Sequence, residues 1–191
     1  MFYNKYSTPG LLTTLDVSNW DTSNVTNMRT MFNFCSNLVT LNTTNWDTSK
    51  VTDMYSMFYN CTSLTALDVS NWNTSNVTNM YNTFAHCETL TTLNVSNWNT
   101  SNVTDMSQMF WGCENLSSLD VSNWDTGNVT EIINMFLDCY ALAELDVSEW
   151  DTSSMNNIRD AFNSCKSLTT LDVSNWDTSN VTNMDGTFTH C

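Results

Sequence analysis

The chain has 191 residues and a formal net charge of −15, from 20 acidic and only 5 basic side chains. Phosphate neutralisation requires clustered Lys and Arg, so this charge argues against nucleic acid and against anionic membrane surfaces as partners. Charged residues make up 13% of the chain, and periodic Trp and Phe alternate with Ser, Thr and Asn, which indicates a folded protein.

Residues 1–10 differ from the rest of the chain and contain its single proline, Pro9. We expect them to form an N-terminal cap over the first apolar coil or to be a linker. They lack the apolar core of a signal peptide, and no window approaches the roughly 18 apolar residues of a membrane span. The protein is therefore either intracellular or a secreted protein whose targeting segment has been removed, and it is not expected to insert into a membrane.

From residue 11 to residue 191 the chain repeats one pattern every 26 residues without an insertion. A row of tryptophans marks the period: Trp20, Trp46, Trp72, Trp98, Trp124, Trp150 and Trp176. A fixed period of this size is typical of folds in which each unit buries its apolar face only against its neighbours. We therefore predict one elongated domain of seven coils, the last of them incomplete.

Each unit changes its apolar period as the chain proceeds. Residues 12–17 alternate apolar and polar side chains, which predicts a short, half-buried strand. Residues 18–24 are rich in Ser, Asn, Asp and Thr, so they predict a turn with Trp20 as its inward corner. The apolar residues of 28–35 are spaced i, i+3, i+4, i+7, which predicts a one- to two-turn helix or a 3₁₀ segment.

The strand pattern of residues 12–17 resembles the L-x-x-L-x-L motif of leucine-rich repeats. More narrowly, LDVSNWDTSNVTNM followed by MFxxC resembles the 26-residue repeat of BspA-like bacterial surface proteins, over residues 11–191. The resemblance implies a right-handed solenoid with a parallel β-sheet on one face and short helical or 3₁₀ segments on the other. It also implies an extracellular, cell-surface protein of the adhesion or host-interaction type, but supplies neither a ligand nor a catalytic residue.

The sequence lacks the residue sets that carry catalysis. Its two histidines, His86 and His190, lie four coils apart, and no Cys-x-x-Cys, glycine-rich phosphate loop or Ser-His-Asp set occurs. A strict repeat places one residue type in a line, whereas a catalytic site needs different types that converge. We therefore predict that the protein is not an enzyme and has no cofactor, apart from the calcium considered below.

The seven cysteines share one position of the repeat, from Cys35 to Cys191. Coils stacked at the strand spacing of roughly 4.8 Å bring neighbouring cysteines within nominal reach, but parallel Cβ vectors disfavour the disulfide dihedral. We expect a buried row of free thiols, with disulfides between coils or a metal site as the alternatives.

Polar rows on the exposed strand positions are the candidate binding face. The row consists of Asp16, Asn42, Asp68, Asn94, Asp120, Asp146 and Asp172. Glu144 belongs to a flanking row, and a second Asp and Asn row follows the Trp corner. Carboxylates roughly 5 Å apart repel by about 0.8 kcal/mol in water. They therefore either stay solvated and cap turns or bind a cation such as Ca²⁺.

Trp111 lies outside the tryptophan row, beside Phe110. We expect it on the outer face of its coil, either as an exposed anchor for a partner or packed against the coil of Phe136.

These features predict a binding or adhesion module that presents an acidic and polar sheet face to a protein or glycan on another cell or host surface. The chain stops at Cys191 without a polar closing coil. The structural alternative is therefore end-to-end stacking of copies into dimers or fibres, with Ca²⁺ as a candidate stabiliser.

Overall fold

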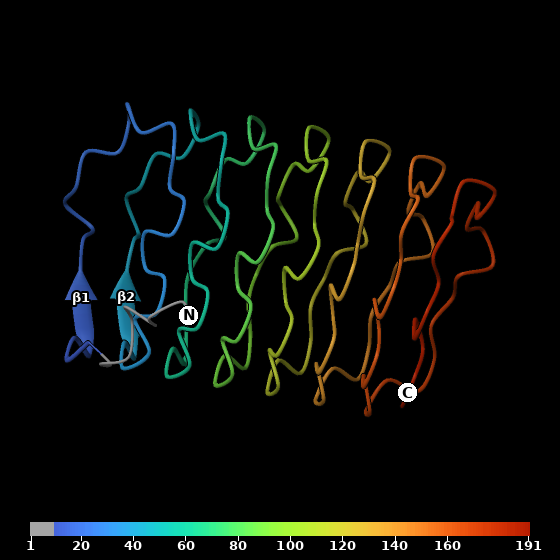
Figure 1. Cartoon of the computed structure of the whole chain (residues 1–191). Coiled ribbons are helices and arrows are strands. Elements are labelled where there is room, and N and C mark those ends of the chain that lie inside the picture. Colours follow the sequence, from blue (N-terminus) through green and yellow to red (C-terminus); the bar gives the residue numbers. More distant parts are fainter. Residues whose placement is uncertain (1–9) are drawn as a thin grey trace, which may run out of the picture.

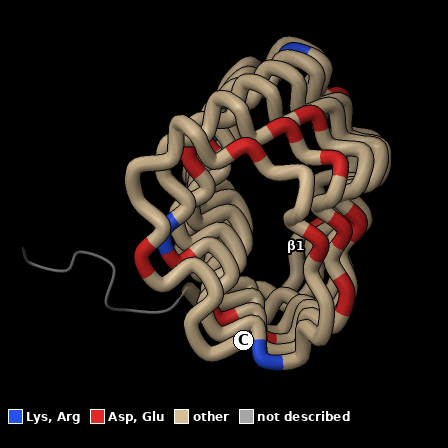
Figure 2. Tube along the Cα trace, turned by 90° about the vertical axis from the view of Figure 1, so that its right-hand side faces the viewer, with Lys and Arg blue, Asp and Glu red and all other residues tan. Residues whose placement is uncertain are grey.

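The computed structural model describes residues 10–191, so the predicted N-terminal cap or linker lies outside the described residues except for Gly10. The chain winds into coils that lie side by side from β1 to the C-terminal end (Figure 1). Seen along the stack, successive coils follow a common outline (Figure 2). Equivalent residues of neighbouring coils are therefore adjacent, as the 26-residue period predicts.

A small parallel sheet lies on one side of the stack. Strand β1, Thr14–Asp16, pairs in parallel with β2, Thr40–Asn42, and Leu15 lies opposite Leu41. Single parallel bridges continue this line in later coils: Thr40 with Ala66, Thr92 with Ser118, and Ser118 with Glu144. The predicted parallel sheet is confirmed, but within residues 10–191 regular strands occur in the first two coils alone.

A second line of parallel bridges, which the sequence did not reveal, follows the Asn27 position through the stack. It joins Asn27, Asp53, Asn79, Asp105, Glu131, Asn157 and Asn183. Side-chain oxygens on this line close local turns, because the backbone N–H of Arg29 donates to Asn27 Oδ1 at 2.9 Å and that of Tyr55 donates to Asp53 Oδ1 at 3.0 Å. The line thus combines pairing between coils with turn capping inside each coil.

The apolar stripe of residues 28–35 is only partly buried in the first coil, where Met28 and Phe32 are buried, Cys35 is half-buried and Met31 is exposed. The predicted helical or 3₁₀ segment is wrong. In the second coil Met54, Phe58 and Cys61 are fully buried. Residues 10–191 nevertheless contain no helix, and the segment consists of consecutive turns.

The spacing of the coils explains the missing helix. Rings of successive phenylalanines lie 5.3 to 5.7 Å apart, about half the 10–12 Å diameter of an α-helix. Turns fit this spacing, and they direct alternate N–H groups to the next coil. The N–H of Phe32 donates to Met57 O at 2.9 Å, whereas the N–H of Asn33 closes a turn onto Thr30 O at 3.1 Å.

These turns place two residues of each coil in the left-handed region, at the positions of Thr30 and Phe34. Their φ angles run from 51° at Ser56 to 70° at Gly112, and most of the residues are not glycine. A non-glycine residue in this region costs of order 1 kcal/mol. The hydrogen bonds that the turns donate to the next coil offset this strain.

Gly112→Ala is expected to lower the free energy of unfolding by about 1–2 kcal/mol. Its φ is +70°, and an added Cβ would lie 2.6 Å from His86 Nδ1. Gly127→Ala is the matched control, because Gly127 has no left-handed φ and its Cβ would meet the Asp151 carboxylate at 3.3 Å. Urea denaturation compares the two variants, and equal losses would contradict the expected strain.

Columns of identical side chains form the core. The rings of Trp46 and Trp72 stack with centroids 6.0 Å apart, and Trp98 Nε1 donates to Val69 O in the preceding coil at 3.1 Å. Trp72 differs, since its buried Nε1 has no partner in the described structure. The residue that precedes Trp72 as Val69 precedes Trp98 is Thr43, whereas the other coils have valine at this position.

The cysteines form a row of free thiols inside the stack, as predicted. Five of them, from Cys61 to Cys165, are buried, and Cys113 Sγ donates to Phe84 O in the preceding coil at 3.2 Å. Burial raises the pKa of Cys61, Cys113 and Cys165 to about 12. These thiols are therefore neutral and shielded at physiological pH.

The described residues include no helix with the length and hydropathy of a membrane span.

Candidate functional site

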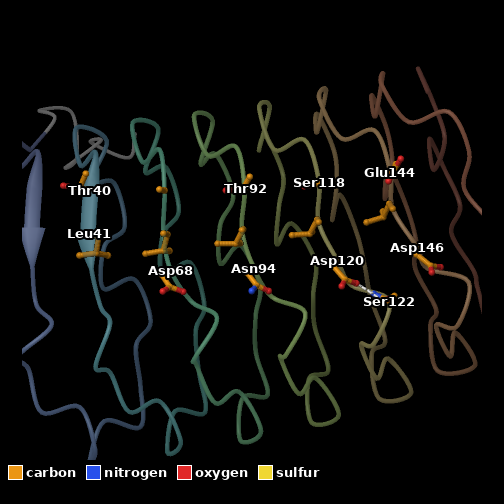
Figure 3. A pocket seen from close by; sticks show the side chains of 15 residues that line it. Thr40, Leu41, Asp68, Thr92, Asn94, Ser118, Asp120, Ser122, Glu144 and Asp146 are labelled. Carbon is orange, nitrogen blue, oxygen red and sulfur yellow. Dashed lines mark hydrogen bonds between the residues drawn. The ribbon is translucent and has the colours of Figure 1, made fainter.

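A groove of about 910 Å³ runs along the strand side of the stack, from the coil of Thr40 to the coil of Asp146 (Figure 3). Its floor is a row of leucines at the middle strand position: Leu41, Leu67, Leu93, Leu119 and Leu145. These leucines keep 6–8% of their surface exposed, whereas Leu38 and its equivalents up to Leu142 are fully buried. The floor therefore offers a continuous apolar strip to a ligand.

Polar side chains border the leucine floor on both sides. One rim contains Thr40, Ala66, Thr92, Ser118 and Glu144, and the other contains Asp68, Asn94, Asp120 and Asp146. In Figure 3 the two rims lie above and below the floor, as Thr92 and Asn94 show. Figure 2 shows acidic positions following one another along the stack beside β1. The groove is thus apolar at its base and acidic along the rim of Asp68, Asp120 and Asp146, whereas the rim of Thr40 is mainly neutral and ends at Glu144.

The rim carboxylates also cap turns, which confirms one of the two roles predicted for them. Asp68 Oδ1 accepts hydrogen bonds from the hydroxyl of Ser70 at 2.7 Å and from its backbone N–H at 3.0 Å. Such bonds, from the hydroxyl first and the backbone second, lower the pKa of Asp68 and of Asp146 below the usual aspartate value. The rim therefore stays negatively charged at neutral pH.

The second Asp and Asn row, after the Trp corner, caps turns as predicted. Asp151 Oδ1 accepts the backbone N–H of Ser153 at 2.9 Å, and Asp125 Oδ1 accepts that of Gly127 at 3.1 Å. No member of this row lines the groove within the described structure. The two rows thus share one local geometry but only the first borders the groove.

The groove brings together only part of the predicted site. Asp68, Asn94, Asp120, Asp146 and Glu144 line it. Three members of the same strand row are exposed but lie beyond its lining residues: Asp16, Asn42 and Asp172.

Trp111 lies apart from the groove and is half-buried. Its ring centroid is 4.4 Å from that of His86 in the preceding coil. Packing of Trp111 against the coil of Phe136 stays a prediction. Its predicted role as an anchor for a partner stays a prediction.

Sequence reasoning assigned the floor leucines to the core and so missed their part in the site. Leu41 and Leu38 belong to the same L-x-x-L pattern, and nothing in their identity separates them. The available signal was position, because Leu41 lies between two exposed residues of the strand, Thr40 and Asn42.

Calcium binding stays a prediction. Residues 10–191 contain no group of three or more His, Cys, Asp or Glu side chains placed to hold a metal ion. The carboxylates lie along lines, whereas Ca²⁺ takes six to eight converging oxygens.

A stack of 26-residue coils with parallel pairing between neighbours is a repeat-type fold, similar to that of a leucine-rich repeat protein. The chain belongs to the family described as Mycoplasma protein of unknown function, DUF285, whose model matches residues 1–117 and 78–191. No curated protein matches the chain in sequence.

Among solved structures, the fold is similar to that of a leucine-rich repeat protein from Eubacterium ventriosum ATCC 27560. The TM-score is 0.59 and the identity 23%, over 93% of this chain and 42% of that one. The chain thus spans less than half of that relative's length. An internalin from Listeria monocytogenes is less similar, with a TM-score of 0.24 and 16% identity over 81% of this chain and 69% of that one.

Proposed function

We propose that this protein is a non-enzymatic binding or adhesion module of the cell surface, and that its coils form a right-handed solenoid which presents the groove to a protein or glycan. The observation that supports it best is the leucine floor between two polar rims. The extracellular location and the adhesion role come from the resemblance to BspA-like repeats.

The chemistry of the groove supports binding more than catalysis. The floor supplies apolar contact area, worth roughly 25 cal/mol per Å² removed from water. The rim supplies charged acceptors at Asp68, Asp120 and Asp146, each on a separate coil. A ligand that spans several coils can therefore collect one polar contact per coil, and basic or hydroxyl groups suit these acceptors.

The triple variant Asp120→Lys, Asp146→Lys, Asp172→Lys is expected to lose at least about tenfold in binding to host-cell surfaces. Asp120 and Asp146 line the groove and Asp172 continues their row beyond it, so the reversed charges repel a ligand whose groups suit the carboxylates. Binding of the fluorescently labelled protein to a panel of cell types is measured by flow cytometry. The matched control reverses Asp125, Asp151 and Asp177, which lie in the same coils and bear the same charge but do not line the groove. Equal binding by both triple variants and the parent protein would contradict the proposal.

A second candidate function is structural, namely end-to-end stacking of copies through apolar side chains of the terminal coils of the described stack. Trp20 is 53% exposed in the first coil, and Phe188 is 49% exposed in the last. Copies that stack end to end would bury these faces by a head-to-tail contact. Sedimentation velocity at several concentrations separates the candidates, because a lone binding module stays monomeric. A melt with and without chelator tests the proposed stabilisation by Ca²⁺.

A further inference from the structure

The groove runs along the stack, and each coil that it crosses contributes one leucine to its floor, from Leu41 to Leu145 (Figure 3). The rims lie one residue before and one residue after each leucine, as Thr92 and Asn94 do beside Leu93. A ligand that covers the floor must therefore follow the stack from coil to coil.

The backbone under the groove is already paired between coils, which disfavours an extended peptide as this ligand. Parallel bridges join Thr40 with Ala66, Thr92 with Ser118, and Ser118 with Glu144. An extended peptide gains its affinity from main-chain hydrogen bonds at the edge of a sheet, but the groove lies over the paired coils and not along an edge. A helix satisfies its own backbone groups, so it binds through side chains alone.

The spacing of the coils also matches a helix better than an extended chain. Coils paired in parallel lie about 4.8 Å apart and one helical turn rises about 5.4 Å, so over the steps from Leu41 to Leu145 the two differ by about 2.4 Å in all. An extended chain presents side chains to one face about every 6.6 Å, and over the same steps it departs from the leucines by about 7 Å, which is more than one coil. An apolar stripe spaced i, i+3, i+4, i+7 therefore stays above the floor along its whole length.

One rim carries carboxylates that are held in place with one oxygen free. Asp120 Oδ1 accepts the hydroxyl of Ser122 at 2.7 Å, and Asp146 Oδ1 accepts that of Ser148 at 2.8 Å. The backbone N–H groups of the same serines donate to Oδ1 as well, and Oδ2 accepts no hydrogen bond from a described residue. Neither carboxylate forms an ion pair within residues 10–191. Both therefore suit a basic group supplied by a partner.

These charges lie on one flank of the floor, so they also fix where the ligand needs basic residues. Among the lining residues the opposite rim is charged at Glu144 alone. Asp68 and Asp120 are two coils apart, with the neutral Asn94 between them. Asp146 follows one coil after Asp120. Since a helical turn takes about 3.6 residues, these steps correspond to helix positions i, i+7 and i+11.

We propose that the groove binds an amphipathic helix of a partner protein, which lies along the stack with its apolar stripe on the leucine floor and its basic residues at Asp68, Asp120 and Asp146. The proposal rests on the binding function proposed for the groove and narrows its ligand to one class. Lys and Arg suit this geometry, because their long stems lie along apolar surface while their charged ends reach the rim. The net charge of −15 also draws a basic segment toward the protein.

The test uses a labelled peptide of about 18 residues, roughly 27 Å long as a helix. It has leucines on one face and lysines at i, i+7 and i+11, and it is compared with the same peptide interrupted by two prolines. Fluorescence anisotropy at physiological salt is expected to show that the proline peptide binds the protein at least about tenfold more weakly. Because residues 10–191 contain no helix, circular dichroism is expected to show the gain of helix by the first peptide when it binds.

The rim variant Asp68→Asn, Asp120→Asn, Asp146→Asn removes the charges and keeps the turn caps. Asparagine already caps this turn at Asn94, whose Oδ1 accepts the hydroxyl of Ser96 at 2.9 Å. The rim variant is expected to bind the helical peptide at least about tenfold more weakly than the parent protein. Thermal melts check that it folds.

The matched control is Asp125→Asn, Asp151→Asn, Asp177→Asn, which loses the same net charge away from the groove. Asparagine occupies this row naturally at Asn73 and Asn99. The control is expected to bind the helical peptide within about twofold of the parent protein, because physiological salt screens charges that do not touch the ligand.

Unchanged affinity of the rim variant would overturn the proposal, as would equal binding of the two peptides or failure of the helical peptide to bind the parent protein. A neutral glycan that binds the parent and not the rim variant would also overturn it, by assigning the groove to sugars. In each of these cases a loss of cell binding by the charge-reversed variant would still support the proposed function of the groove. The helical ligand and the binding function therefore fail separately.

Discussion

Replacing Trp98 by alanine is expected to lower the free energy of unfolding by about 3–5 kcal/mol, whereas Trp20→Ala is expected to cost less than about 1 kcal/mol. Both residues hold the same position of the repeat. Trp98 is 3% exposed and Trp20 is 53% exposed. The comparison therefore separates the contribution of stacking from that of the residue type.

The contacts of Trp98 explain the size of its effect. Its ring stacks on Trp72 with centroids 6.3 Å apart, and its Nε1 donates to Val69 O. Alanine would leave a cavity between two coils and remove one of the two hydrogen bonds that Val69 O accepts, the other coming from the backbone N–H of Trp72. Guanidinium denaturation of both variants gives the two losses. Equal losses would show that stability does not come from the contacts between coils.

Raising the pH from about 8 to about 10.5 is expected to remove roughly 2 kcal/mol of stability for each of three buried thiols, Cys61, Cys113 and Cys165. Burial raises their pKa in the folded protein to about 12 from an ordinary value of 9.0. The unfolded chain ionises above pH 9.0 while the folded chain stays neutral. The stabilisation is therefore complete below the unfolded pKa and is lost as the pH rises through the folded one.

Cys113→Ala isolates the contribution of one thiol. This variant is expected to lose about 2 kcal/mol less than the parent protein between the two pH values, because alanine cannot ionise. Tyrosines and lysines titrate in the same range, but they do so equally in both proteins and cancel. Cys191→Ala serves as the control, since Cys191 is exposed. Urea denaturation under reducing conditions measures the differences, and identical pH dependence of Cys113→Ala and the parent would contradict the assignment.

The 26-residue period was sufficient to predict the columns of the core, because residues one period apart must meet when coils stack in register. It was not sufficient for the segment from Met28 to Cys35. The spacing i, i+3, i+4, i+7 gives one buried stripe on a helix, and consecutive turns closed by i to i−3 hydrogen bonds give the same stripe. The spacing between coils decides between the helix and the consecutive turns, and the identity of single residues does not reveal that spacing.

The left-handed turn positions and the groove floor were also beyond sequence reasoning. Glycine indicates a left-handed backbone at Gly112 and Gly186. Thr30 and Phe34 adopt the same conformation, but their residue types do not predict it. Leu67 cannot be told from the fully buried Leu64 by its identity. The right-handed sense of the solenoid stays a prediction.

The backbone hydrogen bonds between the turn segments of neighbouring coils all run in one direction. This pattern limits how the number of coils can change. The N–H of Phe58 donates to Thr83 O, and the N–H of Phe84 donates to Met109 O, so the turn segment of each coil donates to its successor, whereas other N–H groups, such as that of Thr78 to Thr52 O, donate to the preceding coil. Duplicating a whole unit inside a gene would therefore create a junction already compatible with both neighbours. Adding or deleting one residue would put donors opposite the wrong carbonyls and disturb every later junction in that coil. Length in such a protein is consequently free to vary, but in steps of one complete unit.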